Sequence, residues 1–455
     1  MSITTINPAN GEVLETYPLM GAAEINEAID SAKRAYQEWK QVSYEQRSGV
    51  LKKAARILRD RSTELAVLMA REMGKPLSQG IAETEKCAWV CEHYAEHAEE
   101  YLAPELVKTE ANKSYVTFQP LGLILAVMPW NFPLWQVFRF AAPALMAGNG
   151  CLLKHASNVT GSALEIEAIL SAAGCPENLF RTLRIQSSDV ASILASPVIK
   201  AVTLTGSGPA GQAVGQAAGK VLKKAILELG GSDAYIVLED ADLEQAAETC
   251  VSSRLINSGQ SCIAAKRFIV VQSALKPFEE LFVEKMRARK MGDPLREDTD
   301  IGPQARRDLR DELHGQVEHS ISQGAKLLLG GIVPDLPGAY YPATVLTKVR
   351  PGMTAFDEEL FGPAAAIISA DSEEQAIELA NNSSFGLGSA VFTRDEARGE
   401  RIASQHLEAG ICVVNTYVRS DPRLPFGGVK DSGYGRELSH YGIKEFVNIK
   451  TVLVN

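Results

Sequence analysis

The spacing of hydrophobic residues divides the chain into a helical N-terminal part and two stretches in which strands and helices alternate. From residue 22 to about residue 103, apolar residues recur every three or four positions, which predicts amphipathic helices packed against a larger body. Between residues 121 and 229, short apolar runs such as LGLILAVMP and IKAVTLTGS alternate with helical segments such as LWQVFRFAAPALMAGN. This alternation predicts βαβ units and a doubly wound parallel sheet.

The alternation restarts at residue 230 and predicts a second α/β domain. DAYIVLE, KRFIVVQ and AAAIISA are typical of buried strands, and helical patterns separate them. The last segment, FVNIKTVLVN, is a strand with no helix after it, and its long apolar edge would be unprotected unless another strand paired with it. We therefore expect two doubly wound parallel-sheet domains with a small β oligomerisation element. The expected bounds are 1–112 with 130–229 for the first domain, 230–425 for the second, and 113–129 with 426–455 for the oligomerisation element.

Composition and charge exclude several classes of protein. The chain has 455 residues, of which 45% are hydrophobic and 22% charged, as in an ordinary globular protein. Its net charge of −10 provides no basic field for a phosphate backbone, so we expect no nucleic acid partner. The start, MSITTINPANG, lacks the pattern of a secretory signal, and LGLILAVMPWNFPLW is broken by prolines and shorter than the roughly 20 residues that cross a bilayer. We expect a cytoplasmic protein without a membrane partner.

The seven cysteines are scattered and odd in number, which is not typical of a disulfide scaffold. The segment CAWVCEHYAEH places Cys87, Cys91, His93 and His97 on a predicted helix. Each pair is four residues apart, but at about 100° per residue the two pairs point roughly 120° apart and do not converge on one ion. We therefore predict no metal site and two half-exposed helical faces.

A glycine-rich turn follows one of the predicted strands. TGSGPAG places Gly206, Gly208 and Gly211 at a strand-to-helix junction, where backbone amides can approach a pyrophosphate. About 20 residues later, LELGG places Glu228 between apolar residues. This carboxylate could hold a ribose, act as a general base with a raised pKa, or be a surface acid at a helix end.

The stretch NSGQSCIAAKR holds Cys262, which is either an inert buried thiol or a nucleophile. A reactive thiol needs positive potential and a base. Lys266 and Arg267 could supply the potential, and Glu228 could be the base.

The stretch MPWNFPLWQVFR holds an amide and an arginine close together. Asn131 could stabilise an oxyanion, and the two prolines stiffen the turn that presents it. A helix that begins near Pro133 would place Trp135 and Arg139 on one face. The arginine could bind a carboxylate of the substrate or pair with an acid elsewhere in the protein.

Six motifs occur together: PWNFP, TGS, LELGG, GQSC, EELFGP and LPFGG. The six motifs have the order and spacing of the aldehyde dehydrogenase superfamily, and the chain resembles that superfamily over nearly its whole length. The resemblance implies that the first domain binds the cofactor and the second is catalytic. It further implies that Cys262 is the nucleophile, that Glu228 is the general base, and that Asn131 and the Cys262 backbone N–H form the oxyanion hole. The implied cofactor site comprises Pro129, Trp130, Lys154, His155, Ser157, Gly206, Ser207, Leu229, Glu359 and Phe361.

One departure from the family pattern bears on the cofactor. NAD-using members carry a glutamate three residues after the lysine, whereas this chain reads KHAS, with Ser157 at that position. A carboxylate would repel a ribose 2′-phosphate, while a serine hydroxyl beside Lys154 could bind one. We expect NADP as the cofactor, with NAD possible.

For the substrate, NFPLWQV, KHA and SDPRLPFGG are similar to succinate-semialdehyde dehydrogenases of the short bacterial type. That similarity implies a small aldehyde whose distal carboxylate binds Arg139 and Ser420, with Trp135 as an apolar wall. Oxidation would pass through a thiohemiacetal and a thioester on Cys262. Another small aliphatic aldehyde is the alternative substrate, and a thiol hydrolase or a non-catalytic structural protein are competing hypotheses. The unpaired C-terminal strand, together with the strand near Val116, predicts a homodimer or homotetramer.

Overall fold

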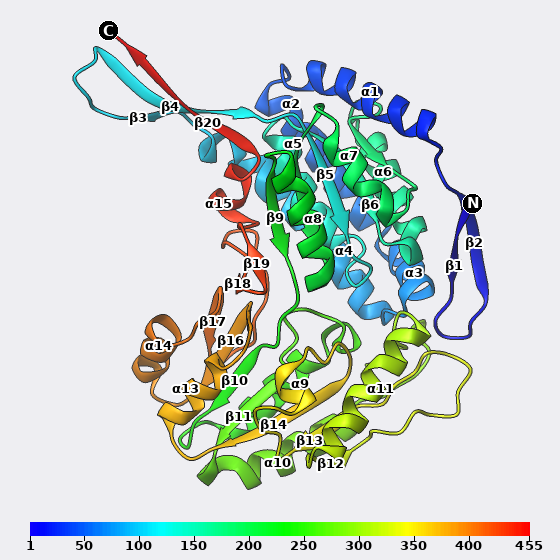
Figure 1. Cartoon of the computed structure of the whole chain (residues 1–455), viewed down its shortest axis with the longest axis vertical. Coiled ribbons are helices and arrows are strands. Elements are labelled where there is room, and N and C mark those ends of the chain that lie inside the picture. The colour runs from blue at the N-terminus through cyan, green and yellow to red at the C-terminus, as the bar shows by residue number, and fades with distance from the viewer.

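The computed structural model describes residues 1–455 as two α/β lobes and a protruding β arm (Figure 1). The predicted N-terminal helices are present. They follow a β-hairpin that the sequence pattern did not predict. These elements are β1 (Ser2–Ile6), β2 (Val13–Pro18), α1 (Ala22–Trp39), α2 (Tyr44–Asp60), α3 (Ser62–Met73) and α4 (Leu77–Tyr101).

The first lobe is built on a six-stranded sheet in the order β19-β9-β8-β5-β6-β7, parallel except for β19. Its strands are β5 (Leu123–Met128), β6 (Gly150–His155), β7 (Phe180–Thr182), β8 (Ile199–Thr205), β9 (Lys224–Glu228) and β19 (Gly433–Tyr434). The helices between the parallel strands are α5 (Trp135–Met146), α6 (Thr160–Ala172), α7 (Val190–Ala195) and α8 (Gly208–Lys220). The predicted alternation is confirmed here.

The second lobe holds a seven-stranded sheet in the order β12-β13-β14-β11-β10-β16-β17, parallel except for β12. Its strands are β10 (Ala234–Val237), β11 (Arg267–Val271), β12 (Lys326–Leu329), β13 (Thr344–Thr347), β14 (Ala364–Ala370), β16 (Gly388–Phe392) and β17 (Ile411–Val414). Its helices are α9 (Leu243–Arg254), α10 (Gln272–Arg287), α11 (Arg307–Ser322), α12 (Thr354–Asp357), α13 (Glu373–Asn381) and α14 (Glu396–Gln405).

The arm at the upper left of Figure 1 is a three-stranded antiparallel sheet in the order β20-β4-β3. It comprises β3 (Glu105–Leu106), β4 (Lys113–Pro120) and β20 (Val447–Val454), and it follows α15 (Ser439–Lys444). The segment expected to form the oligomerisation element divides between two sheets. β4 lies in the arm, whereas the apolar strand β5 is buried inside the six-stranded sheet. A short pair, β15 (Phe385–Gly386) with β18 (Val429–Lys430), lies near the junction of the lobes.

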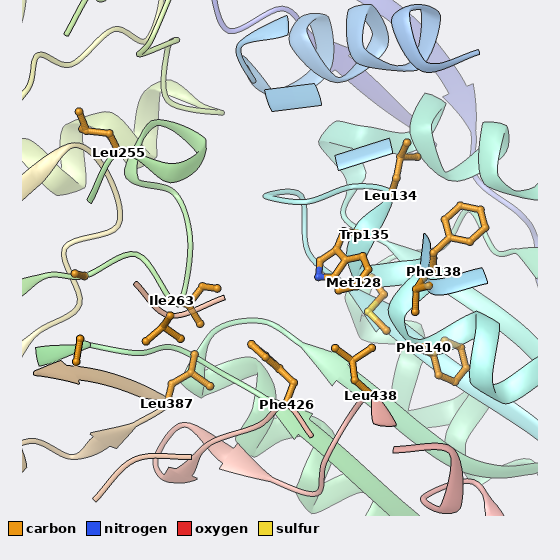
Figure 2. Close-up of a cluster of buried hydrophobic side chains, with 14 of the residues drawn as sticks. Met128, Leu134, Trp135, Phe138, Phe140, Leu255, Ile263, Leu387, Phe426 and Leu438 are labelled. Atoms are coloured by element: carbon orange, nitrogen blue, oxygen red, sulfur yellow. The ribbon is translucent and has the colours of Figure 1, made fainter. Parts of the chain in front are cut away.

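The two lobes share one hydrophobic core. A single cluster of 93 buried residues extends under both sheets. In Figure 2, Met128 and Phe138 lie on the side of the first lobe, Ile263 and Leu387 lie on the other side, and Phe426 lies between them. This continuous packing fixes the position of the lobes relative to each other.

The cysteine-rich segment lies on α4, as predicted, but it is more buried than expected. Cys87 and Cys91 are fully buried and His93 is 6% exposed, because α4 packs between α2 and α5. The prediction of two half-exposed faces is therefore wrong for the cysteine pair, whereas the histidine pair is partly exposed, since the His97 side chain is 43% exposed. No three His, Cys, Asp or Glu side chains are grouped so that they could hold a metal ion, and no helix is long and apolar enough to span a membrane.

Candidate active site

The predicted site segments follow the carboxyl ends of neighbouring parallel strands. β5 leads into Pro129–Asn131, β8 leads into Gly206, and β9 ends at Glu228, which lies beside Thr205 in the register of the sheet. Ligands of open α/β sheets bind at this edge. The fold therefore brings together motifs that are up to 100 residues apart in the sequence.

A cavity of about 980 Å³ opens at this edge of the sheet. At its wall α8 begins at Gly208, and Ser207, which precedes it, makes no capping hydrogen bond with its side chain. A side chain at Gly208 would meet no atom within 4 Å, so the helix N-terminus faces open space. Such a terminus suits an anionic pyrophosphate. The predicted residues that line the cavity are Pro129, Trp130, Asn131, Gly206, Ser207, Leu229, Cys262, Glu359 and Phe361.

Two side chains of the EELFGP motif are held in fixed positions in the wall of this cavity. Glu359 Oε1 accepts a hydrogen bond of 3.1 Å from the Gly231 N–H and lies 3.2 Å from Lys266 Nζ. Any side chain at Gly230 would collide with the Glu359 carboxylate, which explains the first glycine of LELGG. The Phe361 ring stands edge-on to Trp130 at 5.7 Å.

The KHAS segment lies outside the lining of this cavity. Lys154 is half-buried without an acidic partner, and burial lowers its pKa. Ser157 is exposed and lines a smaller neighbouring cavity of about 490 Å³. His155 is buried and lines neither of these cavities. Its Nε2 lies 2.8 Å from the Pro133 carbonyl, its Nδ1 accepts the Ala156 N–H at 2.9 Å, and burial lowers its pKa to about 4. A neutral His155 therefore braces the turn that carries Asn131.

A second cavity, of about 670 Å³, lies on the other side of Cys262. Trp135, Arg139 and Ser420 line it, as the predicted substrate site requires. Cys262 is the single residue that lines both cavities. A thiol at this junction can meet one ligand from each side.

The loop that carries Cys262 is tightly constrained. Asn257 and Ser258 adopt the left-handed backbone conformation, with φ of 53° and 56°, which non-glycine residues seldom do. The Asn257 side-chain amide donates to the carbonyls of Asn131 at 2.6 Å and Gln260 at 3.0 Å. Asn131 Nδ2 also donates to Gln260 O, at 3.1 Å. Each Asn amide nitrogen carries two hydrogens, so Asn131 keeps one donor beside the loop of Cys262.

The electrostatic surroundings of Cys262 differ partly from the prediction. Lys266 Nζ donates to the carbonyls of Ser261 at 2.8 Å and Cys262 at 2.6 Å, so this cation lies beside the thiol's own backbone. Arg267 instead binds the carbonyls of Ser232, Leu379 and Ala380. Burial raises the pKa of Cys262 to about 12, and Lys266 is the strongest of the groups that oppose this shift. The thiol is therefore protonated at neutral pH and needs a base.

The carboxylate of Glu228 is only 2% exposed and lines neither cavity. Its oxygens have no hydrogen-bond partner, and one of them lies against Gly427. Burial, and then the charge of Glu437, raise the pKa of Glu228 well above its ordinary value. To act on a ligand of Cys262, the carboxyl group has to turn away from Gly427.

Arg139 pairs with an acid inside the protein, which was the alternative to a substrate carboxylate. Its Nε forms a buried ion pair with Glu437, and its Nη2 donates to Thr205 Oγ1 at 3.2 Å. Its guanidinium also lies 4.7 Å from the centroid of the Phe426 ring. Arg139 thus lines the second cavity with its charge already compensated.

Two charged residues of the site were missed by sequence reasoning. Glu437 follows the last glycine-rich segment and carries no motif that would reveal its partner. Lys86, on α4, lines the second cavity, and its Nζ donates to Ser420 Oγ at 2.7 Å. It directly precedes the segment considered for a metal site, and nothing in the local pattern distinguishes it from a surface lysine.

A buried acid holds the Asn131 turn in place. Glu83 Oε1 accepts the N–H groups of Leu134 and Trp135, both at 2.9 Å, at the start of α5. Its other oxygen pairs with the buried Lys75. These bonds satisfy helix N-terminal amides that otherwise lack partners.

Comparison with known proteins agrees with this geometry. The family model described as "Aldehyde dehydrogenase family" matches residues 1–452. A probable NADP(+)-dependent succinate-semialdehyde dehydrogenase of Synechocystis sp. is 50% identical over 100% of both chains, and the NAD(P)+ succinate semialdehyde dehydrogenase Sad of Escherichia coli is 49% identical over 98% of this chain and 97% of its own. The crystal structure of succinic semialdehyde dehydrogenase from Streptococcus pyogenes with NADP+ superposes with a TM-score of 0.97, at 36% identity and with 99% of each chain covered. The chain therefore belongs to the aldehyde dehydrogenase family.

Proposed function

We propose that the protein is a cytoplasmic enzyme that oxidises succinic semialdehyde to succinate with NADP+, and with NAD+ as the second choice. The observation that carries the proposal is the position of Cys262 as the one residue shared by the two cavities. Two observations support the choice of an acidic aldehyde. The relatives from Synechocystis and Escherichia coli are named succinate-semialdehyde dehydrogenases, and cations line the second cavity, of about 670 Å³.

In this proposal the Cys262 sulfur adds to the aldehyde carbon and gives up its proton to a base. The carbonyl oxygen then carries the negative charge, and Asn131 Nδ2 and the Cys262 N–H donate hydrogen bonds to it. NADP+, held by Ser207, the start of α8 and Glu359, would supply the hydride acceptor, and loss of the hydride from the carbon bound to Cys262 would leave a thioester on this residue. A water that loses its proton to Glu228 attacks the thioester, so that the carboxylic acid leaves and the thiol is restored.

The cofactor preference rests on the KHAS segment. Lys154 has no acidic partner, and Ser157 is exposed two residues beyond the end of β6, so neither would repel a 2′-phosphate. We propose that these two residues bind the ribose phosphate, with Ser207 and the start of α8 at the pyrophosphate and Glu359 at the other ribose.

The assay that tests the proposal follows the absorbance of NADPH after the protein is mixed with NADP+ and succinic semialdehyde. Butanal has the same chain length without the carboxylate and is the matched control. We expect a higher kcat/KM for succinic semialdehyde. Equal or better use of butanal would contradict the proposed substrate, and the absence of NADPH with every aldehyde would contradict the reaction.

We also propose that the arm pairs with a second copy of the chain in a homodimer or homotetramer. β20 lies at the edge of the arm, and its Ile449 and Leu453 are 61% and 60% exposed. An apolar edge strand of this length invites pairing with another strand.

A further inference from the structure

The substrate cavity contains a cation that has no acidic partner. Lys86 is half-buried on α4, and its Nζ lies 4.4 Å from the centroid of the Trp135 ring and 2.7 Å from Ser420 Oγ. Trp135 and Ser420 line the same cavity. No carboxylate approaches Lys86 within ion-pair distance, although the chain carries 56 acidic residues.

The acids around the cavity that could compensate Lys86 are bound elsewhere. Glu83, one turn earlier on α4, pairs with Lys75 and accepts the two amides at the start of α5. Asp421, beside Ser420, pairs with Arg423 at 2.6 Å.

Asp300, which also lines the cavity, accepts the Lys290 backbone N–H at 2.8 Å, and Glu437, behind Arg139, pairs with that arginine. Five cations line the cavity: Lys86, Arg139, Arg289, Arg419 and Arg423. Arg139, Arg289 and Arg423 have acidic partners and Arg419 is exposed, so Lys86 is the one half-buried cation without an acid.

An anion in this cavity would relieve an unfavourable charge distribution. Burial, followed by repulsion from Arg139, lowers the pKa of Lys86 to about 8. A buried charge is costly unless it is paired, so a ligand carboxylate beside Lys86 would gain a charge-assisted hydrogen bond. The Ser420 hydroxyl accepts its hydrogen bond from Lys86, which leaves the hydroxyl proton free to donate to the same anion.

We propose that Lys86 binds the distal carboxylate of the aldehyde beside Ser420, and that Lys86 determines the preference for acidic over uncharged aldehydes. This inference rests on the proposed function and deepens it. Arg139, held by Glu437, adds positive potential from the wall of the cavity without being the main partner of the carboxylate. The apolar face of Trp135 would then pack against the methylene groups between the aldehyde and the carboxylate.

The test compares Lys86→Met, which removes the charge, with Lys86→Arg, which keeps it. Lys86→Met removes a hydrogen bond between two charged groups. We therefore expect KM for succinic semialdehyde to rise about 10- to 100-fold, with little change in kcat. Lys86→Arg should restore most of the affinity. The kcat/KM for butanal should fall far less than that for succinic semialdehyde in both variants, and urea titration checks that they are folded. Lys52→Met, an exposed lysine on α2, is the matched control for the loss of a helical lysine.

The outcomes distinguish the subsite from the function. If Lys86→Met keeps the wild-type preference for succinic semialdehyde over butanal, the subsite is overturned and the proposed function stands. If the wild-type protein itself shows no such preference, both are overturned. Equal losses with the two aldehydes would mean that Lys86 only positions Trp135 or α5. Should Lys86→Met fold poorly, Lys86→Gln keeps a donor for Ser420, and inhibition by succinate, which should weaken about 10-fold or more, gives the same answer without turnover.

Discussion

The two cavities that meet at Cys262 are built from different parts of the chain. The cofactor cavity uses strand ends, glycines and the start of α8, so much of its surface is backbone that follows one motif after another. The substrate cavity is lined largely by side chains of α4, α5 and the segments 252–263 and 417–426, among them the half-buried Lys86 and the buried Arg139. In the proposed function the first cavity holds the shared part of the cofactor largely through backbone groups, while the side chains of Lys154 and Ser157, outside this cavity, select between NADP+ and NAD+. The second lets single substitutions change which aldehyde is used.

The largest effect should come from the residue that both cavities share. Removing the nucleophile in Cys262→Ala should lower kcat by roughly 10⁴-fold or more with every aldehyde, because no covalent intermediate can form. Steady-state NADPH formation measures the loss. Cys412→Ala, which removes another half-buried thiol, should keep nearly full activity. Substantial turnover by Cys262→Ala would mean that the cavities meet without sharing the chemistry.

The next largest effect should be on the stability of the fold, through the buried ion pair of Arg139 and Glu437. Arg139→Ala leaves the buried Glu437 without its cation and beside Glu228, which predicts a loss of roughly 3–5 kcal/mol in the free energy of unfolding. Urea titration measures this loss. Arg34→Ala breaks an ion pair whose side chains are 66% and 71% exposed and should cost at most about 1 kcal/mol. Similar losses in the two variants would refute the structural role of the Arg139–Glu437 pair.

On the cofactor side, Ser157→Glu should reverse the preference between NADP+ and NAD+. A carboxylate near Lys154 would repel the 2′-phosphate and accept hydrogen bonds from a free 2′-hydroxyl. We expect KM for NADP+ to rise about 10- to 100-fold, with a smaller fall in KM for NAD+. Ser157→Gln has a similar shape without the charge, and it separates repulsion from crowding. An unchanged KM for NADP+ in Ser157→Glu would place the phosphate elsewhere.

The smallest effect should appear in the pH dependence of specificity. Lys86 faces Glu83 and Cys87 on its own helix, Arg139 on α5 and Asp421 beyond β17, and its pKa is lowered to about 8. It is positively charged below that pH and neutral above it. The ratio of kcat/KM for succinic semialdehyde to that for butanal should therefore fall up to about 10-fold as the pH rises through 8.

The ionisation of Cys262 cancels in that ratio because both aldehydes use the same thiol. In Lys86→Met the ratio should stay level across the same pH range. A wild-type ratio that does not change with pH would argue against a charged Lys86 at the carboxylate.

Sequence reasoning succeeded where the information is local. The run LILAVM is apolar throughout because β5 is buried on both faces, and TGSGPAG marks a strand end and a helix start within seven residues. Asn131, Gly206 and Glu228 come together because each lies at or just after the end of a strand at one edge of the six-stranded sheet, whereas Cys262 reaches the same place from the loop before β11.

Sequence reasoning failed where the contact partner of a site residue comes from a distant element. Glu437 reaches Arg139 only because the segment before α15 folds back on the six-stranded sheet, and Lys86 enters the cavity only through the packing of α4 against α5. The ring of His155 is held by the Pro133 carbonyl, 22 residues earlier, which the KHAS pattern does not indicate. Neither the hydrophobic periodicity nor the composition of a segment indicates which distant residue its side chains will contact.

The most direct test of the account is to trap the acyl group on Cys262. Glu228→Gln should slow hydrolysis of the thioester, so that a single turnover with NADP+ and succinic semialdehyde leaves one succinyl group on the protein. Mass spectrometry of the peptides after rapid acid quenching locates the group. The account predicts a succinyl group on Cys262, formed together with one equivalent of NADPH. Formation of NADPH while Cys262 stays unmodified, or a succinyl group on another cysteine, would contradict it.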